Sequence, residues 1–351
     1  MNMEDLLRLL VQKGASDLHL RVPSPPVLRI DGTLIPQGDL PAVTPQFIKE
    51  SLEHIANERQ LERFYNELEL DMAYGIPGLA RFRVNAFFQR GTISIAIRQI
   101  PIKVPTIDEL GLPQVCKALA MKQRGLVLVT GQTGQGKSTT LAAMINHMNK
   151  NDRRHVITIE DPIEYLHQNE KCLIGQREMG DDTKSFANAL KHSLREDPDV
   201  ILVGEMRDLD TISTAITAAE TGHLVMSTVH TANAPQTIDR IIDVFPPHQQ
   251  EQIRFQLSLV LEGVLSQLLI PRASGRGRIA AIEIMIATDA IRNLIREGKT
   301  EQIPSYMQTG RQLEMQTMDQ ALQELVRTGI ITLEEALIRC TKPEELKRIR
   351  L

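Results

Sequence analysis

The order of apolar and polar residues divides the chain into two regions. In the first hundred residues, apolar positions three and four apart alternate with short runs in which every second residue is apolar. The first helical group comprises Met3, Leu6, Leu7, Leu10 and Val11. It predicts a helix that Gly14 is placed to end.

Hairpins follow in the same region. "VLRIDGTLI" at 27–35 contains an Asp31-Gly32 pair that suits a tight turn, and Thr44-Pro45 has the residues that open a helix. "FRVNAFF" at 82–88 and "TISIAIR" at 92–98 both alternate, on either side of a turn at 89–91. We therefore predict an α+β domain over residues 1–100. Proline and glycine then mark a connector over 101–113.

Beyond the connector, apolar strands without alternation are separated by helices. The strands are "LVLVT", "HVITIE", "VILVG" and "LVMSTV", and helices are predicted from Lys137, near 184–195 and near 208–221. This order is typical of a parallel sheet covered on both faces, so the region 114–351 is predicted to be a nucleotide-binding α/β core. From Pro246 onward the pattern is mostly helical, apart from a strand-like run at 279–286, and C-terminal helices are expected from about 270.

Composition argues against some classes of function but does not identify the function itself. The chain has 351 residues, a net charge of -4 and a pI near 6.2, which provide no overall basic field for nucleic acid or an anionic membrane. No apolar run approaches the about 20 residues that cross a bilayer, and the N-terminus lacks the features of a secretory signal. We expect a cytoplasmic protein whose contact with membranes is through a partner. The three cysteines are too far apart to predict a zinc site or a disulfide framework.

The segment "GQTGQGKSTT" at 131–140 contains the pattern G-x-x-x-x-G-K-S. It follows a predicted strand and opens a predicted helix, so its backbone amides and the helix N-terminus can bind phosphate. Lys137 is predicted to reach the outer phosphates and Ser138 to bind Mg²⁺. The predicted nucleotide-binding residues are Gly131, Thr133, Gly134, Gln135, Gly136, Lys137, Ser138 and Thr139. "NKND" at 149–152 resembles a guanine-selecting motif but ends the helix that begins at this loop, so we favour adenine.

Polar residues at the ends of the later strands supply candidate catalytic groups. Glu205 follows "VILVG", and we predict that it orients or deprotonates the attacking water. Glu160, Asp161 and Glu164 follow the neighbouring strand, where carboxylates can hold Mg²⁺ or its waters. His230, at the end of "LVMSTV", is a candidate sensor of the terminal phosphate. His223, at the start of that strand, is a weaker candidate.

The N-terminal hairpin carries two arginines on one face. Folding it about Arg90 places Arg83 and Arg98 nearly opposite each other, which is unfavourable unless an anion lies close by. A phosphate held by a neighbouring subunit would be such an anion. The alternative is that both arginines are simply solvated.

An ordered series of motifs resembles the secretion ATPase superfamily, and most of all the PilT-like retraction ATPases of type IV pili. They include "GASDLHL", "ARFRVNAF", the phosphate loop, "TIEDPIE", "LREDPDVILVGEMRD", "TAAETGHLV" and "STVHT", and the resemblance covers essentially the whole chain. It implies a RecA-like core with a smaller PAS-like α+β N-terminal domain, and a homohexamer in which that domain packs on the next subunit's core. Arg83 and Arg98 would then reach a neighbour's nucleotide, and the part of Arg81 is left open. Gln132 and Gln135 replace the proline and serine common in the family.

The resemblance also implies a function. The expected protein is a motor that hydrolyses Mg-ATP and retracts a type IV pilus through an inner-membrane platform protein. "AIRNLIREGK" at 290–299 resembles a motif that the retraction branch needs, and its Arg292, Arg296 and Lys299 are expected to be available to a partner. The alternatives are an accessory ring that binds nucleotide but scarcely hydrolyses it, and a related secretion or traffic ATPase.

Overall fold

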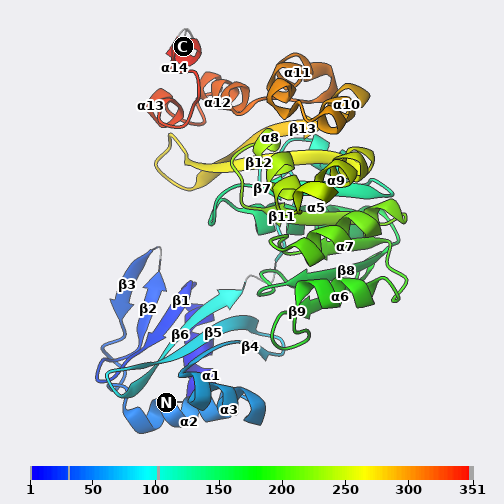
Figure 1. Ribbon diagram of the computed structural model, residues 1–351. Helices are drawn as coiled ribbons and strands as arrows, with labels where there is room; N and C mark the ends of the chain where they lie inside the picture. Colours follow the sequence, from blue (N-terminus) through cyan, green and yellow to red (C-terminus); the bar gives the residue numbers. More distant parts are fainter. Residues whose placement is uncertain (1, 31, 101–102, 348–351) are drawn as a thin grey trace. The chain divides into compact units, whose positions relative to one another are not determined.

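The structure, a computed structural model, describes residues 2–30, 32–100 and 103–347 (Figure 1). Its two compact units are Met1–Lys103 with Glu164–Leu166, and Val104–Ile163 with His167–Leu351. Asp31 of the predicted hairpin turn and residues 101–102 of the predicted connector lie outside the described residues. Each unit is described by itself below.

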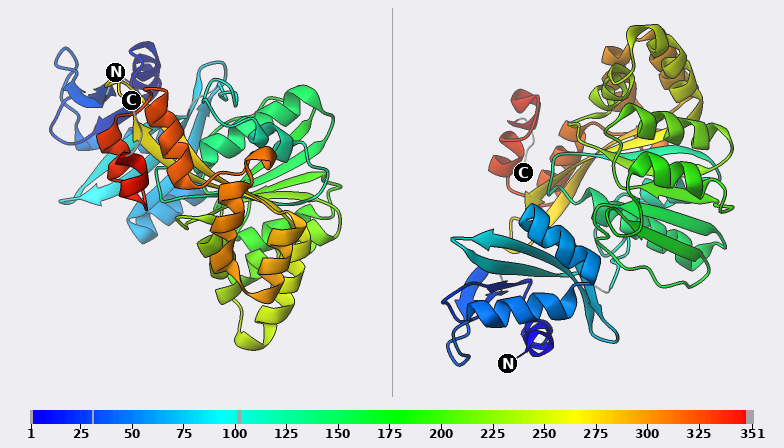
Figure 2. Two further views of the ribbon diagram at one scale, coloured as in Figure 1. Left: turned by 90° about the horizontal axis from the view of Figure 1, so that it is seen from above. Right: turned by 60° about the horizontal axis from the view of Figure 1, so that its bottom comes forward.

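The first unit is an antiparallel sheet covered by helices. The strands are β1 (Asp17–Leu20), β2 (Val27–Ile30), β3 (Thr33–Pro36), β4 (Glu69–Ile76), β5 (Ala80–Gln89) and β6 (Thr92–Ile100). They pair in the order β3-β2-β1-β6-β5-β4. The helices α1 (Met3–Gln12), α2 (Pro45–Ile55) and α3 (Glu58–Glu67) lie against one face of this sheet (Figure 2). The predicted alternation explains this layering, because every second strand residue faces the helices.

Local chemistry places the helix ends of this unit. The Thr44 hydroxyl accepts a hydrogen bond from the Phe47 amide at the start of α2, with Pro45 as the first helical residue. Asn57 and Gln60 form a reciprocal capping box at the start of α3. The predicted helix at 3–11 and the predicted hairpin strands at 82–88 and 92–98 are confirmed.

The second unit contains a seven-stranded sheet. Its strands are β7 (Gly125–Thr130), β8 (His155–Glu160), β9 (Leu173–Glu178), β10 (Val200–Val203), β11 (Leu224–Val229), β12 (Leu261–Pro271) and β13 (Arg278–Ile286). They pair in the order β13-β12-β7-β11-β10-β8-β9, and only β13 runs antiparallel to its neighbour. The carboxyl ends of the parallel strands therefore meet at one edge of the sheet, where α/β proteins bind their ligands.

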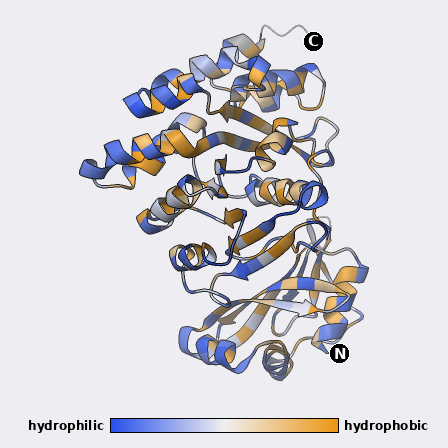
Figure 3. Ribbon diagram, turned by 90° about the vertical axis from the view of Figure 1, so that its right-hand side faces the viewer, coloured by the Kyte–Doolittle hydropathy of each residue, from blue (hydrophilic) through white to orange (hydrophobic). Residues whose placement is uncertain are grey.

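Helices cover both faces of this sheet. One face packs against α6 (Phe186–Ser193), α7 (Leu209–Glu220), α8 (Ala234–Asp243) and α9 (Pro247–Val260), and the other against α4 (Val115–Ala120) and α5 (Lys137–Asn151). The central strands β7, β10 and β11 are fully buried, which explains why their residues are apolar without alternation. Figure 3 shows the apolar strands between helices whose outer sides are polar.

One prediction for this region was wrong. The strand-like run predicted at 279–286 is confirmed as β13, but the sequence from Pro246 was otherwise interpreted as mostly helical, whereas Leu261–Pro271 is the strand β12. Because β12 pairs with β7 and β13 and is buried on both faces, its apolar run has no period that distinguishes strand from helix. Strand β9 was also missed.

The chain continues through α10 (Asp289–Glu297), the short helices η1 (Thr300–Gln302), α11 (Ile303–Thr309) and η2 (Arg311–Leu313), and then α12 (Met318–Arg327), α13 (Leu333–Leu337) and α14 (Pro343–Lys347). In α10, Arg292 donates to the carbonyls of Ser258 and Leu259 at 2.8 Å and to Glu262 at 2.9 Å. Arg292 thus caps the C-terminal carbonyls of α9, and the expectation that its side chain is available to a partner was wrong. Arg296 is exposed. Within the described residues, no helix has the length and apolar character needed to span a membrane.

Candidate functional site

The phosphate loop joins the end of β7 to the start of α5. Gly136 adopts φ 83° immediately before the first residue of α5, a left-handed conformation that favours glycine. Gly131 has φ 142°, and a Cβ there would stand 2.6 Å from the carbonyl oxygen of Gln267. Glycine is therefore required at both positions, by backbone conformation and by the close approach of β12.

Strand β12 holds the loop in place through a buried glutamine. Gln267 Nε2 donates to the backbone oxygen of Gln135 at 2.7 Å, and Gln267 Oε1 accepts from the Thr140 hydroxyl at 2.7 Å. The Gln135 side chain in turn accepts from the amide of Leu269. Gln135, at which the sequence departs from the family pattern, thus ties the loop to β12. Sequence reasoning missed Gln267, because no local pattern marks a contact between residues 132 positions apart.

We expect Gln267→Ala to weaken nucleotide binding about three- to tenfold. The substitution removes two hydrogen bonds that fix the loop and the first turn of α5, and a net loss of about 0.7–1.4 kcal/mol corresponds to that change. Titration with a fluorescent adenine nucleotide measures it. The exposed Gln252→Ala on α9 is the matched control, and equal affinities of the two variants would contradict this role for Gln267.

Lys137, Glu205 and His230 converge at the carboxyl edge of the parallel strands. Lys137 Nζ donates to the backbone oxygens of Gly131 and Gln132 at 2.9 and 3.1 Å and lies 3.5 Å from His230 Nδ1. His230 Nε2 lies 3.5 Å from a carboxylate oxygen of Glu205. A lysine, a carboxylate and an imidazole from three separate segments are thus within reach of one phosphoryl group.

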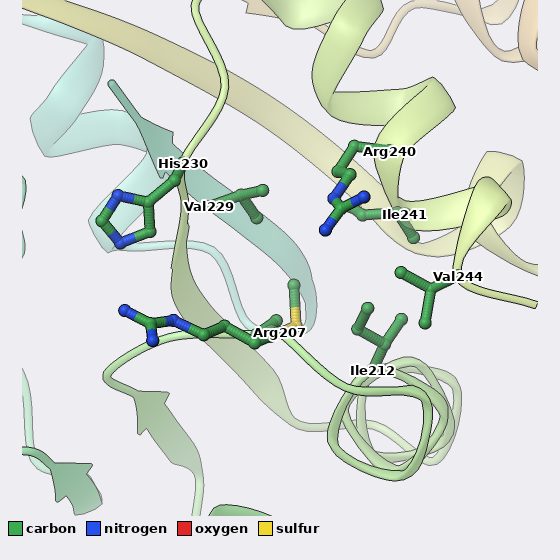
Figure 4. A pocket seen from close by; sticks show the side chains of 8 residues that line it. Arg207, Ile212, Val229, His230, Arg240, Ile241 and Val244 are labelled. Atoms are coloured by element: carbon green, nitrogen blue, oxygen red, sulfur yellow. The ribbon is translucent and has the colours of Figure 1, made fainter. Parts of the chain in front are cut away.

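Arg207 is a further member of this cluster that the sequence did not assign. Its Nε forms an ion pair with Glu205 at 2.8 Å. A cavity of about 230 Å³ opens beside it, with Arg207 and His230 on one side, Arg240 on the other together with Ile212, Ile241 and Val244, and Val229 of β11 between them (Figure 4). The charge of Glu205 is therefore balanced by Arg207 at the mouth of a cavity lined mostly by apolar side chains.

The surroundings of His230 favour its neutral form. Burial and the positive charge of Lys137 lower its pKa below the ordinary value, against the opposing effect of Glu205. A neutral imidazole can accept a hydrogen bond on one nitrogen while donating from the other. With Nδ1 facing the Lys137 ammonium, His230 can therefore donate from Nε2 either to the Glu205 carboxylate or to a phosphate oxygen that takes its place.

This lowered pKa predicts how stability depends on pH. As the pH falls, His230 of the unfolded chain takes up a proton near the ordinary histidine pKa of about 6.5, whereas in the folded chain it does so only at a lower pH. The free energy of unfolding should therefore decrease as the pH drops below about 6.5. We expect His230→Gln to lose less thermal stability than wild type between pH 7.5 and pH 5.5. Thermal melts at the two pH values measure this, and identical losses in both proteins would contradict it.

The remaining candidate residues, Glu160, Glu164 and His223, belong to three different parts of the structure. Glu160 ends β8, where its Oε1 accepts from the Thr158 hydroxyl at 2.7 Å and from Gln176 Nε2 at 3.1 Å. Glu164 belongs to the segment Glu164–Leu166 of the other compact unit. His223 lies at the opposite end of the six-residue β11 from His230, and its ring contacts the Ala218 carbonyl at 2.9 Å. His223 therefore caps the C-terminal end of α7.

The oxygen donors at this edge fit a magnesium ion. The Ser138 hydroxyl on α5 and the carboxylates of Glu160 and Asp161 after β8 are hard oxygen ligands of the kind Mg²⁺ prefers. Among the residues that the structure describes, no group of three or more histidine, cysteine, aspartate or glutamate side chains forms a metal cage. Mg²⁺ commonly keeps several waters and takes its other ligands from one or two protein oxygens and substrate phosphates.

The two arginines of the first unit lie directly opposite each other, as predicted, in the pairing of β5 with β6. Arg98 Nε donates to Asp17 at 2.8 Å, and Arg83 Nε lies 3.7 Å from Asp71. Burial raises the pKa of the Asp17 carboxyl, but hydrogen bonds from Arg98 and Ser16 outweigh that effect and leave the pKa below its ordinary value. Two aspartates of the same sheet thus offset the repulsion, while both arginine side chains remain substantially exposed.

A phosphate loop between β7 and α5, with a lysine, a glutamate and a histidine gathered at the carboxyl edge of a parallel sheet, defines a nucleotide-binding protein of the P-loop class. Residues 79–275 match the family described as "Type II/IV secretion system protein". The chain belongs to this family.

Individual relatives extend the similarity to the whole chain. It is 50% identical over 344 residues to the "Type IV pilus retractation ATPase PilT" of Pseudomonas aeruginosa, covering 98% of this chain and 99% of that protein. It is 43% identical over 347 residues to the "Type IV pilus ATPase PilU" of the same organism, covering 99% and 91%. The solved "Crystal Structure of the Pilus Retraction Motor PilT and Bound ADP" has a TM-score of 0.93 at 46% identity, covering 99% of this chain and all of that one. The resemblance predicted from the motifs and the α/β fold with a parallel core are confirmed.

Proposed function

We propose that this protein is an ATP-hydrolysing motor that powers retraction of a type IV pilus and hence twitching motility. Similarity over the full chain to proteins named as pilus retraction ATPases supports the biological role. The convergence of Lys137, Glu205 and His230 on the phosphate loop is the observation that carries the chemistry.

Each side chain has a role that its position favours. The loop amides and the N-terminus of α5 bind the phosphates, and Lys137 directs its ammonium group to the outer ones. Glu205 orients the attacking water and accepts its proton, while neutral His230 contacts the terminal phosphate. Ser138, together with Glu160 and Asp161 partly through water, would hold Mg²⁺, which would stabilise the charge of the phosphates. Glu164 is proposed as a further carboxylate of this acidic segment.

Arg83 and Arg98 act across a subunit boundary in this proposal. Both side chains are exposed on the polar face of the first unit, although Arg98 pairs with Asp17 at 2.8 Å and Arg83 lies 3.7 Å from Asp71. In a homohexamer they would extend to the nucleotide of the next subunit and stabilise the charge of the transition state. ATP hydrolysis would then be coupled to movement of neighbouring subunits against each other.

The proposed partners follow from the pilus relatives. The hexamer would work at the inner face of the cytoplasmic membrane, bound to an inner-membrane platform protein and through it to the pilus. Arg296, exposed on α10, is a residue by which such a partner could be bound. Neither insertion of this chain into the bilayer nor binding to nucleic acid is part of the proposal.

Imaging of labelled pili in the source organism tests this function. Deletion of the gene should leave pili that extend but do not retract and should abolish twitching. Wild type should restore retraction, whereas Glu205→Gln should not. Retraction that persists after deletion, or is restored by Glu205→Gln, would favour the alternative of an accessory ring that binds nucleotide without driving movement.

A further inference from the structure

A row of polar side chains crosses the larger sheet behind the phosphate loop. Thr130, the last residue of β7, pairs with Ser266 of β12, and Ser266 pairs with Glu283 of β13. Thr130 and Ser266 are fully buried and Glu283 is 8% exposed. The Thr130 hydroxyl donates to Ser266 Oγ at 3.0 Å, and Ser266 interacts with the carboxylate of Glu283, its direct partner in the pairing of β12 with β13. A row of interacting polar side chains therefore begins one residue before Gly131.

Glu283 also binds the first turns of two helices. Its Oε1 accepts from the Ala234 amide at the start of α8 at 2.8 Å. The carboxylate also interacts with the Met318 amide at the start of α12, and the neighbouring residue Ile284 exchanges two backbone hydrogen bonds with Gln316, two residues before that helix. Both amides are among the donors that a helix cannot satisfy internally, and a carboxylate is favoured at such ends. One buried side chain thus joins β12, α8 and α12.

The two helices belong to different parts of the unit. The chain that enters α8 passes through His230, four residues before Ala234, and Val229 of β11 pairs directly with Thr130. Helix α12 instead packs with α13 on the far part of β12 and β13. Glu283 therefore contacts the segment after the proposed phosphate sensor and the C-terminal helices at the same time.

Because Glu283 is buried, its interactions with Ala234, Ser266 and Met318 depend on one another. Burial raises the pKa of the carboxyl, and its hydrogen bonds with Ala234, Ser266 and Met318 act in the opposite direction. A buried carboxylate is costly unless it is hydrogen-bonded, and its donors lose a partner if it moves. A shift of the loop at His230 or of β7 must therefore alter the contacts of α12 as well.

We propose that Glu283 is a positioning residue that couples the phosphate loop and the His230 segment to the C-terminal helix α12. The inference rests on the proposed nucleotide site and adds a route by which its state reaches a distant helix. Glu283 contacts no reacting group in this scheme. It acts by holding two helix ends and the hydroxyl of Ser266.

Hydrogen exchange with and without Mg-ADP tests the coupling. In wild type, nucleotide should slow exchange at residues 131–139 and also, by at least about threefold, at the first turn of α12. Glu283→Gln places an amide donor against existing donors, so it should keep the slowing at 131–139 and lose most of it at α12. Ser266→Ala, which leaves both helix contacts in place, should also diminish the α12 response and tests the row if Glu283→Gln does not fold.

Asp319→Asn is the matched control. Asp319 is a second buried carboxylate, on α12 itself, and it accepts from the Thr341 hydroxyl and the amides of Thr341 and Lys342. It should lower thermal stability yet keep the nucleotide-dependent response of α12. The inference is overturned if slowing in wild type is confined to 131–139, or if both row variants retain it at α12. Absence of slowing at 131–139 in wild type would instead refute the proposed nucleotide site, and the inference with it.

Discussion

Glu205→Gln should lower the rate of ATP hydrolysis by at least about a hundredfold while leaving nucleotide affinity within about threefold of wild type. Loss of a positioned general base costs about 10²–10⁴ in rate. Affinity should persist because the loop amides and Lys137, rather than Glu205, bind the phosphates. Phosphate release and nucleotide titration measure the two quantities separately.

Asp210→Asn is the control for this substitution. Asp210 is an exposed carboxylate in the first turn of the nearby helix α7, so its change removes the same charge without touching the cluster. It should keep near wild-type turnover. If Glu205→Gln hydrolyses ATP as fast as Asp210→Asn, the assignment of Glu205 is wrong and another group activates the water.

Arg83→Ala should lower turnover by about a hundredfold or more in assembled rings, because an arginine that stabilises transition-state charge is worth about 10³–10⁵ in phosphoryl transfer. Arg90→Ala is the matched control, since Arg90 is exposed at the turn of the same hairpin. The Arg90 variant should remain active.

Mixed rings decide whether Arg83 acts across subunits. Arg83→Ala and Glu205→Gln subunits should each be inactive alone, but a random mixture forms about one interface in four with both intact groups. Turnover should therefore reappear on mixing. No recovery in rings whose mixed composition is verified by mass would contradict the cross-subunit role, as would full activity of Arg83→Ala alone.

Local chemistry made the centre of the site predictable. The phosphate loop could be placed between β7 and α5 because the spaced glycines, the apolar strand before them and the helix start after them follow one another directly in the sequence. Glu205 and His230 could be placed at the same sheet edge because each follows a predicted parallel strand. The position of Arg83 opposite Arg98 was also predictable, because side chains alternate along each strand and the hairpin turn determines which residues pair.

The supporting contacts could not be predicted in the same way. Gln267 and Glu283 lie on β12 and β13, and β12 was interpreted as helical because its apolar run carries no strand period. Their partners at Gln135 and Ala234 are far away in sequence. The neutralising aspartates Asp17 and Asp71 were likewise missed, since only the order of strands in the sheet shows which residues adjoin the arginines.

Steady-state phosphate release by the purified full chain with Mg-ATP, measured beside Lys137→Ala, tests whether this protein is an ATPase. We expect turnover by wild type and its loss in Lys137→Ala, with both proteins forming assemblies of the same mass. Wild-type turnover no faster than that of Lys137→Ala would contradict the claim that this protein is an ATP-driven motor.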